Sequence, residues 1–555
     1  MSMPSDAVEA IDAPQEPNVT SLAGLARGIS RAIAQPGPLT QQVVKLATDI
    51  ASVAKGSEGF DPGPRDKRFA DPAWRENPLY RRWMQGYVAL TDSLNSLVDE
   101  LENTDTDWRD IERSRFAVGV LNSGISPTNF LPGNPTALKL AFDTAGRSLA
   151  KGARNFLSDL KENKGFPTQT NRSAFEVGKD LAVTPGAVVF RSEVLELIQY
   201  APSTETVYSR PLLISPPPIG RFYFLDLRPG RSFVEYAVSR GQQVFMISWR
   251  NPTPEQCDWD ADTYAGAILE AMDVVKDITG SPDLNTIGFC AGGILQTLVL
   301  NHLTDIGDPT VNSASYAVTL LDFFERAPLG AFSAPRLLEM AGRNSDKEGI
   351  ITARSLATMF NLMRPDDLVF NYVVSNWLMG QDPPVFDILA WNADGTNLPA
   401  ALHKQFLGVF KDNLLCQDGE MEVLGSPVRL KNIDVPLFVT GAINDHLTPW
   451  TGCYRTVQLM SGPSTYVLSN AGHIASLVNP PGNPKATYLA DGPLNGTAEE
   501  WRAGATKHTG SWWEVWATWV GERAGEVRPA PESLGSDRFP PLAEAPGLYV
   551  LDKLP

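Results

Sequence analysis

Residues 285–295, Asn-Thr-Ile-Gly-Phe-Cys-Ala-Gly-Gly-Ile-Leu, join a strand-like apolar run to a helical pattern through a glycine-rich turn at Cys290. The spacing Gly288-x-Cys290-x-Gly292 is typical of a nucleophile elbow, with cysteine where serine is usual. Such a turn strains the backbone of the nucleophile and leaves no room for neighbouring side chains, which explains the glycines. The dipole of the following helix favours a thiolate. The alternative is a buried structural cysteine beside a glycine-rich turn, because short matches of this kind also arise by chance.

The sequence around this turn alternates short apolar segments with helical patterns such as Tyr264 to Ile278. Strands that alternate with helices along the chain indicate βαβ units around a parallel sheet. We therefore predict an α/β catalytic domain over residues 186–555. The predicted strands are residues 195–200, 211–215, 243–248, 285–289, 316–321 and 436–441.

A long insertion separates the last two of these strands. Its residues, about 323–427, are rich in Trp, Phe, Met and Asn. A segment of this length more often folds as a cap than as an unstructured loop. Since caps on α/β enzymes usually control access to the site, we expect this one to do so.

The first third of the chain has helical patterns. Residues 1–20 are acidic and contain proline, which predicts a disordered lead-in by composition. Residues 21–185 are predicted to form an all-helical N-terminal domain, because apolar residues repeat at three- and four-residue steps in 43–53, 83–101 and 138–160. The heptad-like spacing of 83–101 fits an ordinary helix packed in its own domain or a subunit contact.

An elbow nucleophile needs an acid and a histidine on later strand ends, in the chain order nucleophile, acid, histidine. Asp445 follows the predicted strand 436–441, at the carboxyl end where open α/β sheets place their sites. His473 follows the apolar run of residues 464–468, with Gly472 permitting a tight turn. Cys290, Asp445 and His473 therefore meet the requirements of order and placement.

Four other histidines are present in the chain. His302 falls in the helix after the elbow and His403 in the insertion, so both are expected to be surface or packing residues. His446 is the main competitor for the base. However, an acid and a base adjacent in one loop rarely point at the same target, so geometry favours His473. His508 is a further alternative.

A tetrahedral oxyanion needs two backbone N–H donors, one of them from the residue after the nucleophile, here Ala291. The second comes from the loop after an earlier strand. Residues 216–218 are all proline and have no N–H, so Ile219 is the first residue of that run able to donate. The alternative interpretation is that this loop is only a rigid connector.

The choice of cysteine as nucleophile also limits the kinds of reaction that the site is expected to catalyse. A thiolate attacks a thioester almost isoenergetically, whereas the same acyl group transferred to an alcohol yields a more stable oxoester. A covalent cysteine–acyl intermediate is thus easy to form and still energetic enough to pass its acyl group on. Water must be excluded if the acceptor is an alcohol, and the cap is placed to do this.

Composition excludes several classes of function. The 64 acidic and 47 basic residues give a net charge of -17, which disfavours nucleic acids and anionic lipids as partners. Four cysteines lie far apart without a histidine-rich cluster, so we expect neither a disulfide framework nor a metal site, and a cytoplasmic location. The N-terminus lacks the basic start and apolar run of a signal peptide. No run is long and apolar enough for a transmembrane segment.

Several separated stretches, in order, resemble the polyhydroxyalkanoate synthases, polyester-forming acyltransferases with an α/β-hydrolase fold. The resemblance extends from about residue 65 to the C-terminus. The stretches are RFADPAWRENPLYRR (68–82), FEVGKDLAVTPGAVVFR (175–191), ELIQY (196–200), FMISWRNPT (245–253), GFCAGG (288–293), WNADGTNLP (391–399), NDHLTPW (444–450), SNAGHIASLVNPPGNPK (469–485) and SWWEVWATW (511–519).

The resemblance implies that the family's catalytic residues fall on Cys290, Asp445 and His473. It also implies a substrate, (R)-3-hydroxyacyl-CoA, whose acyl group is loaded on the cysteine and joined to the hydroxyl of another unit. His473 then activates Cys290, while Asp445 assists the substrate hydroxyl instead of, or as well as, orienting His473. CoA is the leaving group and no cofactor is expected.

The same resemblance implies a homodimer at the surface of cytoplasmic polyester granules, in contact with the growing chain. NDHLTPW, NPPGNPK and the length resemble class II enzymes, which favour medium-chain monomers. Two other functions remain open: a cysteine hydrolase of thioesters or lactones, and a non-enzymatic granule scaffold. The tryptophans of residues 512–519 fit either core packing or a contact with hydrophobic product, and core packing is favoured because large aromatics dominate cores.

Overall fold

The computed structural model describes residues 36–56, 59–63, 66–324 and 326–552, so the lead-in predicted for residues 1–20 lies outside the described part. The chain divides into two compact units, Met1–Pro127 and Thr128–Pro555.

This division falls upstream of the predicted boundary at residues 185 and 186. The helical pattern of residues 138–160 forms two helices, α6 (Pro135–Asp143) and α7 (Arg147–Glu162), which belong to the second unit. Helix α7 packs against the π-helical turn η10 (Val373–Leu378) of the insertion. A helical pattern alone does not show which core a helix joins, and this is why the two boundaries differ.

The first unit is built around helix α4 (Pro78–Glu100), which contains the heptad-like run. Its buried side chains include Met84, Tyr87 and Val88, which form a small core with Phe69 and Trp74. Of the heptad-like run itself, Tyr87 joins this core, whereas Trp83 is 42% exposed and the later leucines are half-buried. The helices that contact α4 are α2 (Pro36–Ala54), α3 (Ala73–Glu76) and α5 (Trp108–Gly124).

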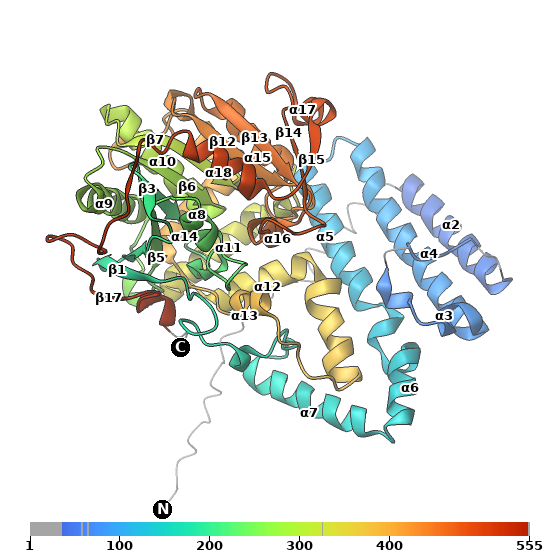
Figure 1. The fold of residues 1–555 in the computed structure, drawn as a ribbon. Helices are drawn as coiled ribbons and strands as arrows, with labels where there is room; N and C mark the ends of the chain where they lie inside the picture. The colour runs from blue at the N-terminus through green and yellow to red at the C-terminus, as the bar shows by residue number, and fades with distance from the viewer. Residues whose placement is uncertain (1–35, 57–58, 64–65, 325, 553–555) are drawn as a thin grey trace, which may run out of the picture. The chain divides into compact units, whose positions relative to one another are not determined.

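The second unit contains an eleven-stranded mixed sheet, seen in Figure 1. Its six central strands run parallel, as the alternating pattern predicts, and antiparallel strands complete both edges. In spatial order the strands are β15 (Thr506–Thr509), β14 (Thr487–Ala490), β13 (Ser464–Ser469), β12 (Leu437–Ala442), β7 (Val311–Ala317), β6 (Leu284–Phe289), β4 (Leu212–Ser215), β5 (Val244–Trp249), β2 (Leu195–Tyr200), β1 (Gly186–Arg191) and β17 (Ala543–Glu544).

Two strand predictions need correction. The segment 195–200 forms strand β2 but pairs antiparallel with β5, so it is not part of a parallel βαβ unit. It follows β1 through a short turn, and a short turn supports only antiparallel pairing with that neighbour. The segment predicted at 316–321 lies instead at Val311–Ala317, because the backbone turns at Val318, which has a φ of 46°.

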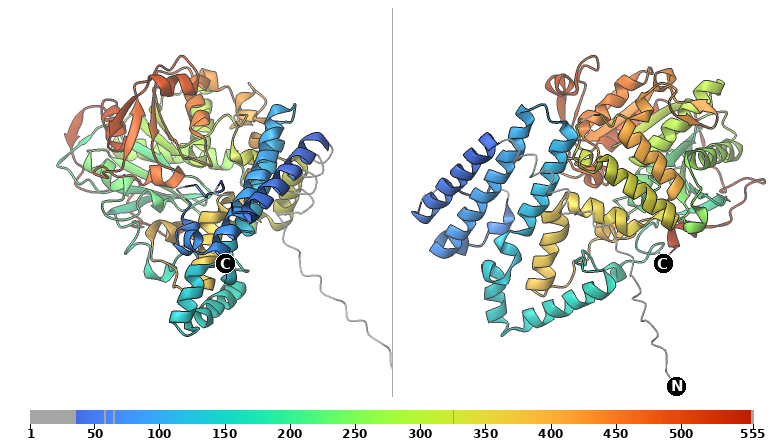
Figure 2. Two further views of the ribbon diagram at one scale, coloured as in Figure 1. Left: turned by 90° about the vertical axis from the view of Figure 1, so that its right-hand side faces the viewer. Right: turned by 180° about the vertical axis from the view of Figure 1, so that it is seen from behind.

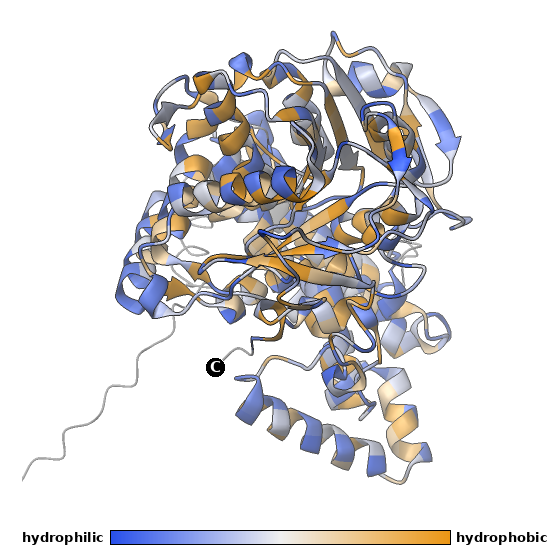
Figure 3. Cartoon of the chain, turned by 60° about the vertical axis from the view of Figure 1, so that its left-hand side comes forward, coloured by the Kyte–Doolittle hydropathy of each residue, from blue (hydrophilic) through white to orange (hydrophobic). Residues whose placement is uncertain are grey.

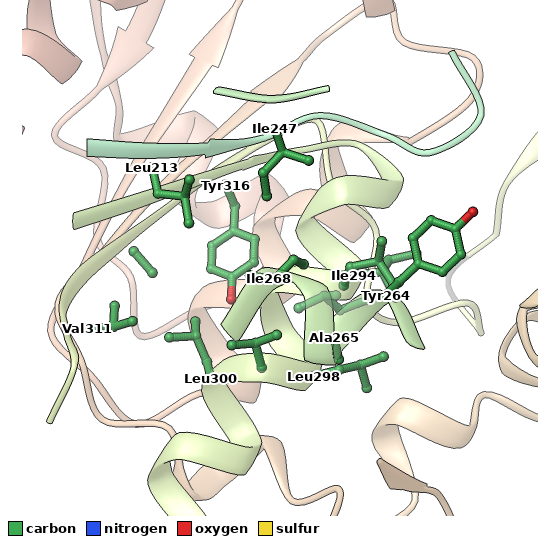
Figure 4. Close-up of a cluster of buried hydrophobic side chains, with 14 of the residues drawn as sticks. Leu213, Ile247, Tyr264, Ala265, Ile268, Ile294, Leu298, Leu300, Val311 and Tyr316 are labelled. Carbon is green, nitrogen blue, oxygen red and sulfur yellow. The ribbon is translucent and has the colours of Figure 1, made fainter. Parts of the chain in front are cut away.

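Both faces of the sheet are buried. Because neighbouring residues on a strand point to opposite faces, each strand contributes side chains to two cores. Figure 4 shows one core, in which Leu213 and Ile247 of the strands meet helices α9 (Ala261–Thr279) and α10 (Ala291–Ile306). On the other face, Ile214 and Met246 pack in a second core with helices α8 (Phe233–Ser239) and α18 (Trp512–Gly521). Figure 3 shows the same strands as hydrophobic ribbons inside more hydrophilic helices.

The tryptophan-rich patch belongs to this second core. Trp512, Trp513 and Trp516 are at most 1% exposed, and Trp519 is 8% exposed. The ring of Phe233 lies 4.7 Å from the ring of Trp516. The patch therefore packs against the sheet and presents little surface to a product.

The insertion lies between β7 and β12 and has secondary structure of its own. In Figure 1 its helices α12 and α13 lie below the sheet, and Figure 2 shows the insertion from two further directions. Its elements include the helices α11 (Pro335–Glu348), α12 (Ala353–Met363), α13 (Asp387–Asn392) and α14 (Ala400–Asp412), the π-helical turns η9 (Asp366–Phe370) and η10, and the short strands β8 (Ile350–Ile351), β9 (Leu398–Pro399), β10 (Glu422–Val423) and β11 (Ser426–Pro427). Among the helices that the structure describes, none is long and apolar enough to cross a membrane.

Candidate active site

Cys290 sits at the turn between strand β6 and helix α10. Its backbone has φ 49° and ψ −123°, a strained conformation for a residue other than glycine. The Cys290 N–H donates to the carbonyl of Ala317 at 2.9 Å, which ties the turn to the end of β7. This is the backbone geometry expected of a nucleophile elbow.

Three glycines make this turn sterically possible. A Cβ on Gly288 would lie 2.5 Å from the Cα of Gly293. A Cβ on Gly292 would lie 2.6 Å from the carbonyl oxygen of Pro216, and one on Gly293 would lie 2.7 Å from the Cγ2 of Thr319. The elbow is therefore pressed against two other chain segments, the loop after β4 and the segment after β7.

Asp445 lies three positions beyond the end of β12, in the loop before helix α15 (Trp450–Leu459). Its side chain is fully buried and accepts several hydrogen bonds. One oxygen, Oδ1, accepts from the backbone N–H groups of Leu447 at 2.8 Å and Thr448 at 3.0 Å. The other, Oδ2, accepts from the Thr448 hydroxyl at 2.8 Å and lies 2.6 Å from Nδ1 of His473. The carboxylate is thus held in one orientation.

His473 begins helix α16 (His473–Leu477), after strand β13 and the turn at Gly472. The imidazole is 5% exposed, its Nδ1 hydrogen-bonds to Asp445, and the ring lies close enough to Cys290 for the sulfur to affect its charge. Burial alone lowers the pKa of His473, but the interactions with Asp445 and with the sulfur of Cys290 raise it to about 10. Burial likewise raises the pKa of Asp445, but the charge of His473 and the hydrogen bonds lower it below its usual 3.8.

These shifts predict a specific dependence of stability on pH. A histidine whose pKa rises from 6.5 to about 10 on folding contributes its full stabilisation below pH 6.5 and loses it as pH rises toward 10. We expect the difference in unfolding free energy between wild type and His473→Gln to shrink over this interval. Denaturant titrations at several pH values measure it, and a difference that stays constant would contradict the ion pair.

The remaining histidines lie in other surroundings. Burial lowers the pKa of His446 to about 4, and no hydrogen bond to Cys290 accompanies that shift. His403 is buried and contacts the Ser345 hydroxyl at 2.6 Å, as expected of a packing residue. His302 hydrogen-bonds to Ser426 at 3.0 Å, and His508 stacks on Tyr488. Of the five histidines, His473 is the one that the structure brings to both Cys290 and Asp445.

Thr448 is a site residue that the sequence interpretation missed. Its hydroxyl donates to Asp445 and lies 3.3 Å from Nδ1 of His473. Its position three residues after the aspartate is the spacing of an Asx-type turn, a signal available in the sequence. The two loops are also joined by the backbone, since Asn444 N–H donates to the Ala471 carbonyl at 3.0 Å.

The two residues proposed as oxyanion donors belong to the two segments that meet at the elbow, helix α10 and the loop after β4. Ala291 is the first residue of α10, directly after Cys290. Ile219 belongs to the loop after β4; Ser215, the last residue of β4, and Pro216 of this loop lie against the elbow at Gly292. In the described part of the chain, no group of three His, Cys, Asp or Glu side chains could hold a metal ion.

The mixed sheet, the strained cysteine turn and the following aspartate and histidine loops define a protein with the α/β-hydrolase fold. Residues 229–480 match the family model of the alpha/beta hydrolase fold, and residues 65–237 match the Poly-beta-hydroxybutyrate polymerase (PhaC) N-terminus. The predicted fold class is thereby confirmed.

Similar proteins identify the family. Poly(3-hydroxyalkanoate) polymerase 1 of Ectopseudomonas oleovorans is 43% identical over 95% of this chain and 93% of its own length. Polymerase 2 of the same organism is 42% identical over 95% of this chain and 94% of its own. The polymerase subunit PhaC of Cupriavidus necator is 38% identical over 95% of this chain and 90% of its own. The chain belongs to the poly(3-hydroxyalkanoate) polymerase family and is an enzyme of the acyltransferase class.

Proposed function

We propose that the protein polymerises (R)-3-hydroxyacyl-CoA through a covalent thioester on Cys290, with release of CoA. The observation that carries the proposal is that His473, which hydrogen-bonds to Asp445, lies next to Cys290 at a strained turn. A histidine with a pKa of about 10 holds a proton at neutral pH and stabilises negative charge on the neighbouring sulfur. Family membership supports the substrate class.

In the loading step, the Cys290 thiolate attacks the thioester carbonyl and forms a bond from Sγ to the acyl carbon. The bond from that carbon to the CoA sulfur breaks, and the protonated His473 gives its proton to the departing CoA thiolate. In the transfer step, the hydroxyl of another unit attacks the Cys290 thioester. Its proton passes to His473 and the Cys290 thiolate is regenerated, so no cofactor takes part.

Asp445 has the role of orienting His473 in this proposal. Both carboxylate oxygens are occupied by donors from its own loop and by His473, and the side chain is fully buried. These contacts favour orientation and charge stabilisation over direct contact with the substrate hydroxyl. The N–H groups of Ala291 and Ile219 are proposed to stabilise the oxyanion in both steps.

Incubation of the purified enzyme with (R)-3-hydroxybutyryl-CoA and (R)-3-hydroxyoctanoyl-CoA tests the proposal. We expect CoA release with formation of polyester, and faster turnover of the longer monomer if the class II-like motifs set the preference. Release of CoA with only free hydroxy acid would instead identify a thioester hydrolase. No release of CoA from either substrate would favour the scaffold function.

We also propose a cellular location and an oligomeric state for the enzyme. A cytoplasmic location at the polyester surface and a homodimeric state follow from the resemblance to the family. Analytical ultracentrifugation with and without substrate tests the dimer, and fractionation of polyester from producing cells tests the association. A monomer at all concentrations, or enzyme absent from the polyester fraction, would contradict these parts of the proposal.

A further inference from the structure

Two buried threonines contact the peptides that carry the proposed oxyanion donors. Thr319 follows strand β7 and is 0% exposed, while Thr396 lies in the insertion just before β9 and is 1% exposed. Neither takes part in the proposed chemistry. Each is remote in sequence from the peptide that it contacts.

The Thr319 hydroxyl lies 3.1 Å from the carbonyl oxygen of Cys290, to which it donates. That carbonyl belongs to the same peptide unit as the N–H of Ala291, the first proposed donor. Because a trans peptide is planar, its C=O and N–H point in opposite directions, and fixing one fixes the other. The hydroxyl therefore constrains the direction of the Ala291 N–H, together with the Gly293 N–H, which donates to the same carbonyl at 3.0 Å.

The same relation recurs at the second proposed donor. The Thr396 hydroxyl donates to the carbonyl oxygen of Pro218 at 2.7 Å. That carbonyl shares its peptide unit with the N–H of Ile219, the second proposed donor. The two preceding peptide units end at the nitrogens of Pro217 and Pro218, which carry no hydrogen. The peptide between Pro218 and Ile219 is therefore the first of the loop whose orientation can direct an N–H donor.

Other bonds hold the loop after β4 without acting on this peptide. Trp249 donates to the Pro216 carbonyl at 2.8 Å, and Trp391 of the insertion donates to the Arg221 carbonyl at 2.7 Å. Overall placement of the loop is thus secured independently of Thr396. What the threonine adds is the orientation of one peptide plane.

We propose that Thr319 and Thr396 are positioning residues of the oxyanion hole, each aiming one backbone N–H by anchoring the carbonyl of the same peptide. This inference rests on the proposed function, because it assumes the Ala291 and Ile219 donors. Since Thr396 lies in the insertion, the insertion contributes to the electrostatics of the reaction. Serine at either position keeps the hydroxyl, and valine keeps the shape without it.

The test compares two reactions of Cys290 in Thr319→Val and Thr396→Val. Acylation by (R)-3-hydroxyoctanoyl-CoA forms a tetrahedral oxyanion, whereas alkylation by iodoacetamide displaces iodide and forms none. We expect each valine variant to slow acylation at saturating substrate by about 10- to 100-fold, the scale of a weakened oxyanion donor. Alkylation should stay at the wild-type rate, and the serine variants should recover acylation.

Thr279→Val is the matched control, because the Thr279 hydroxyl also donates to a buried carbonyl, that of Val275 within α9. It should change neither reaction. Valine variants that acylate at the wild-type rate would overturn the inference, as would equal losses of acylation and alkylation. Wild-type enzyme that is alkylated but never acylated would instead contradict the proposed function on which the inference rests.

Discussion

Replacement of Cys290 by serine is expected to leave a folded protein that releases CoA on the order of 10⁴-fold more slowly, less than the roughly 10⁶-fold loss seen when a triad nucleophile is removed altogether. Serine has nearly the same shape, so the turn and its glycine contacts are preserved. A serine hydroxyl is a much weaker acid than a cysteine thiol and is therefore a poorer nucleophile toward a thioester carbonyl. Steady-state CoA release with the hydroxyacyl-CoA substrate measures the effect.

Cys453→Ser is the matched control for this variant. Cys453 is also buried near Asp445, where its thiol lies 3.6 Å from the Thr448 carbonyl, and burial raises the pKa of Cys453. It has no contact with His473 in the described hydrogen bonds, and its replacement should retain most activity. Turnover near the wild-type rate in Cys290→Ser would remove the nucleophile from the proposed mechanism.

Replacement of His473 by glutamine is expected to slow loading of Cys290 by about 10²- to 10⁴-fold, the usual contribution of a general acid or base. Glutamine can still hydrogen-bond to Asp445, so the loop should stay in place. It cannot hold a titrating proton for the thiol or for the departing CoA. Rapid-quench measurement of the first turnover gives the loading rate directly.

His446→Gln controls for the adjacent histidine. His446 lies next to Asp445 in sequence, and burial holds its pKa near 4. We expect this variant to load at the wild-type rate. The base assignment would fail if His473→Gln loads rapidly, or if the His446 variant shows the larger loss.

The parts of the site with local signals could be predicted from sequence. The glycine spacing around Cys290 indicates a tight turn that has no room for side chains at the neighbouring positions. The structure confirms this, because a Cβ at these glycines would collide with nearby atoms. Asp445 and His473 could be placed because each follows a strand of the parallel sheet. Parallel strands have their carboxyl ends at the same edge of the sheet, so residues that directly follow such strands lie close together there.

The parts that depend on long-range packing could not be predicted. Thr319 and Thr396 carry no local motif, since their roles depend on carbonyls contributed by distant turns. The 195–200 segment has the same apolar pattern as the parallel strands, and its direction is set by a neighbour. Likewise, α7 joins the second unit through contacts with the insertion, about which its own periodicity contains no information.

The most direct test is mass spectrometry of enzyme quenched in acid shortly after mixing with (R)-3-hydroxyoctanoyl-CoA. Digestion then locates any added mass. The account predicts one or more hydroxyacyl units on the peptide that contains Cys290, and no such adduct in Cys290→Ser. CoA release with the acyl group on another residue, or with no covalent adduct at any time, would contradict it.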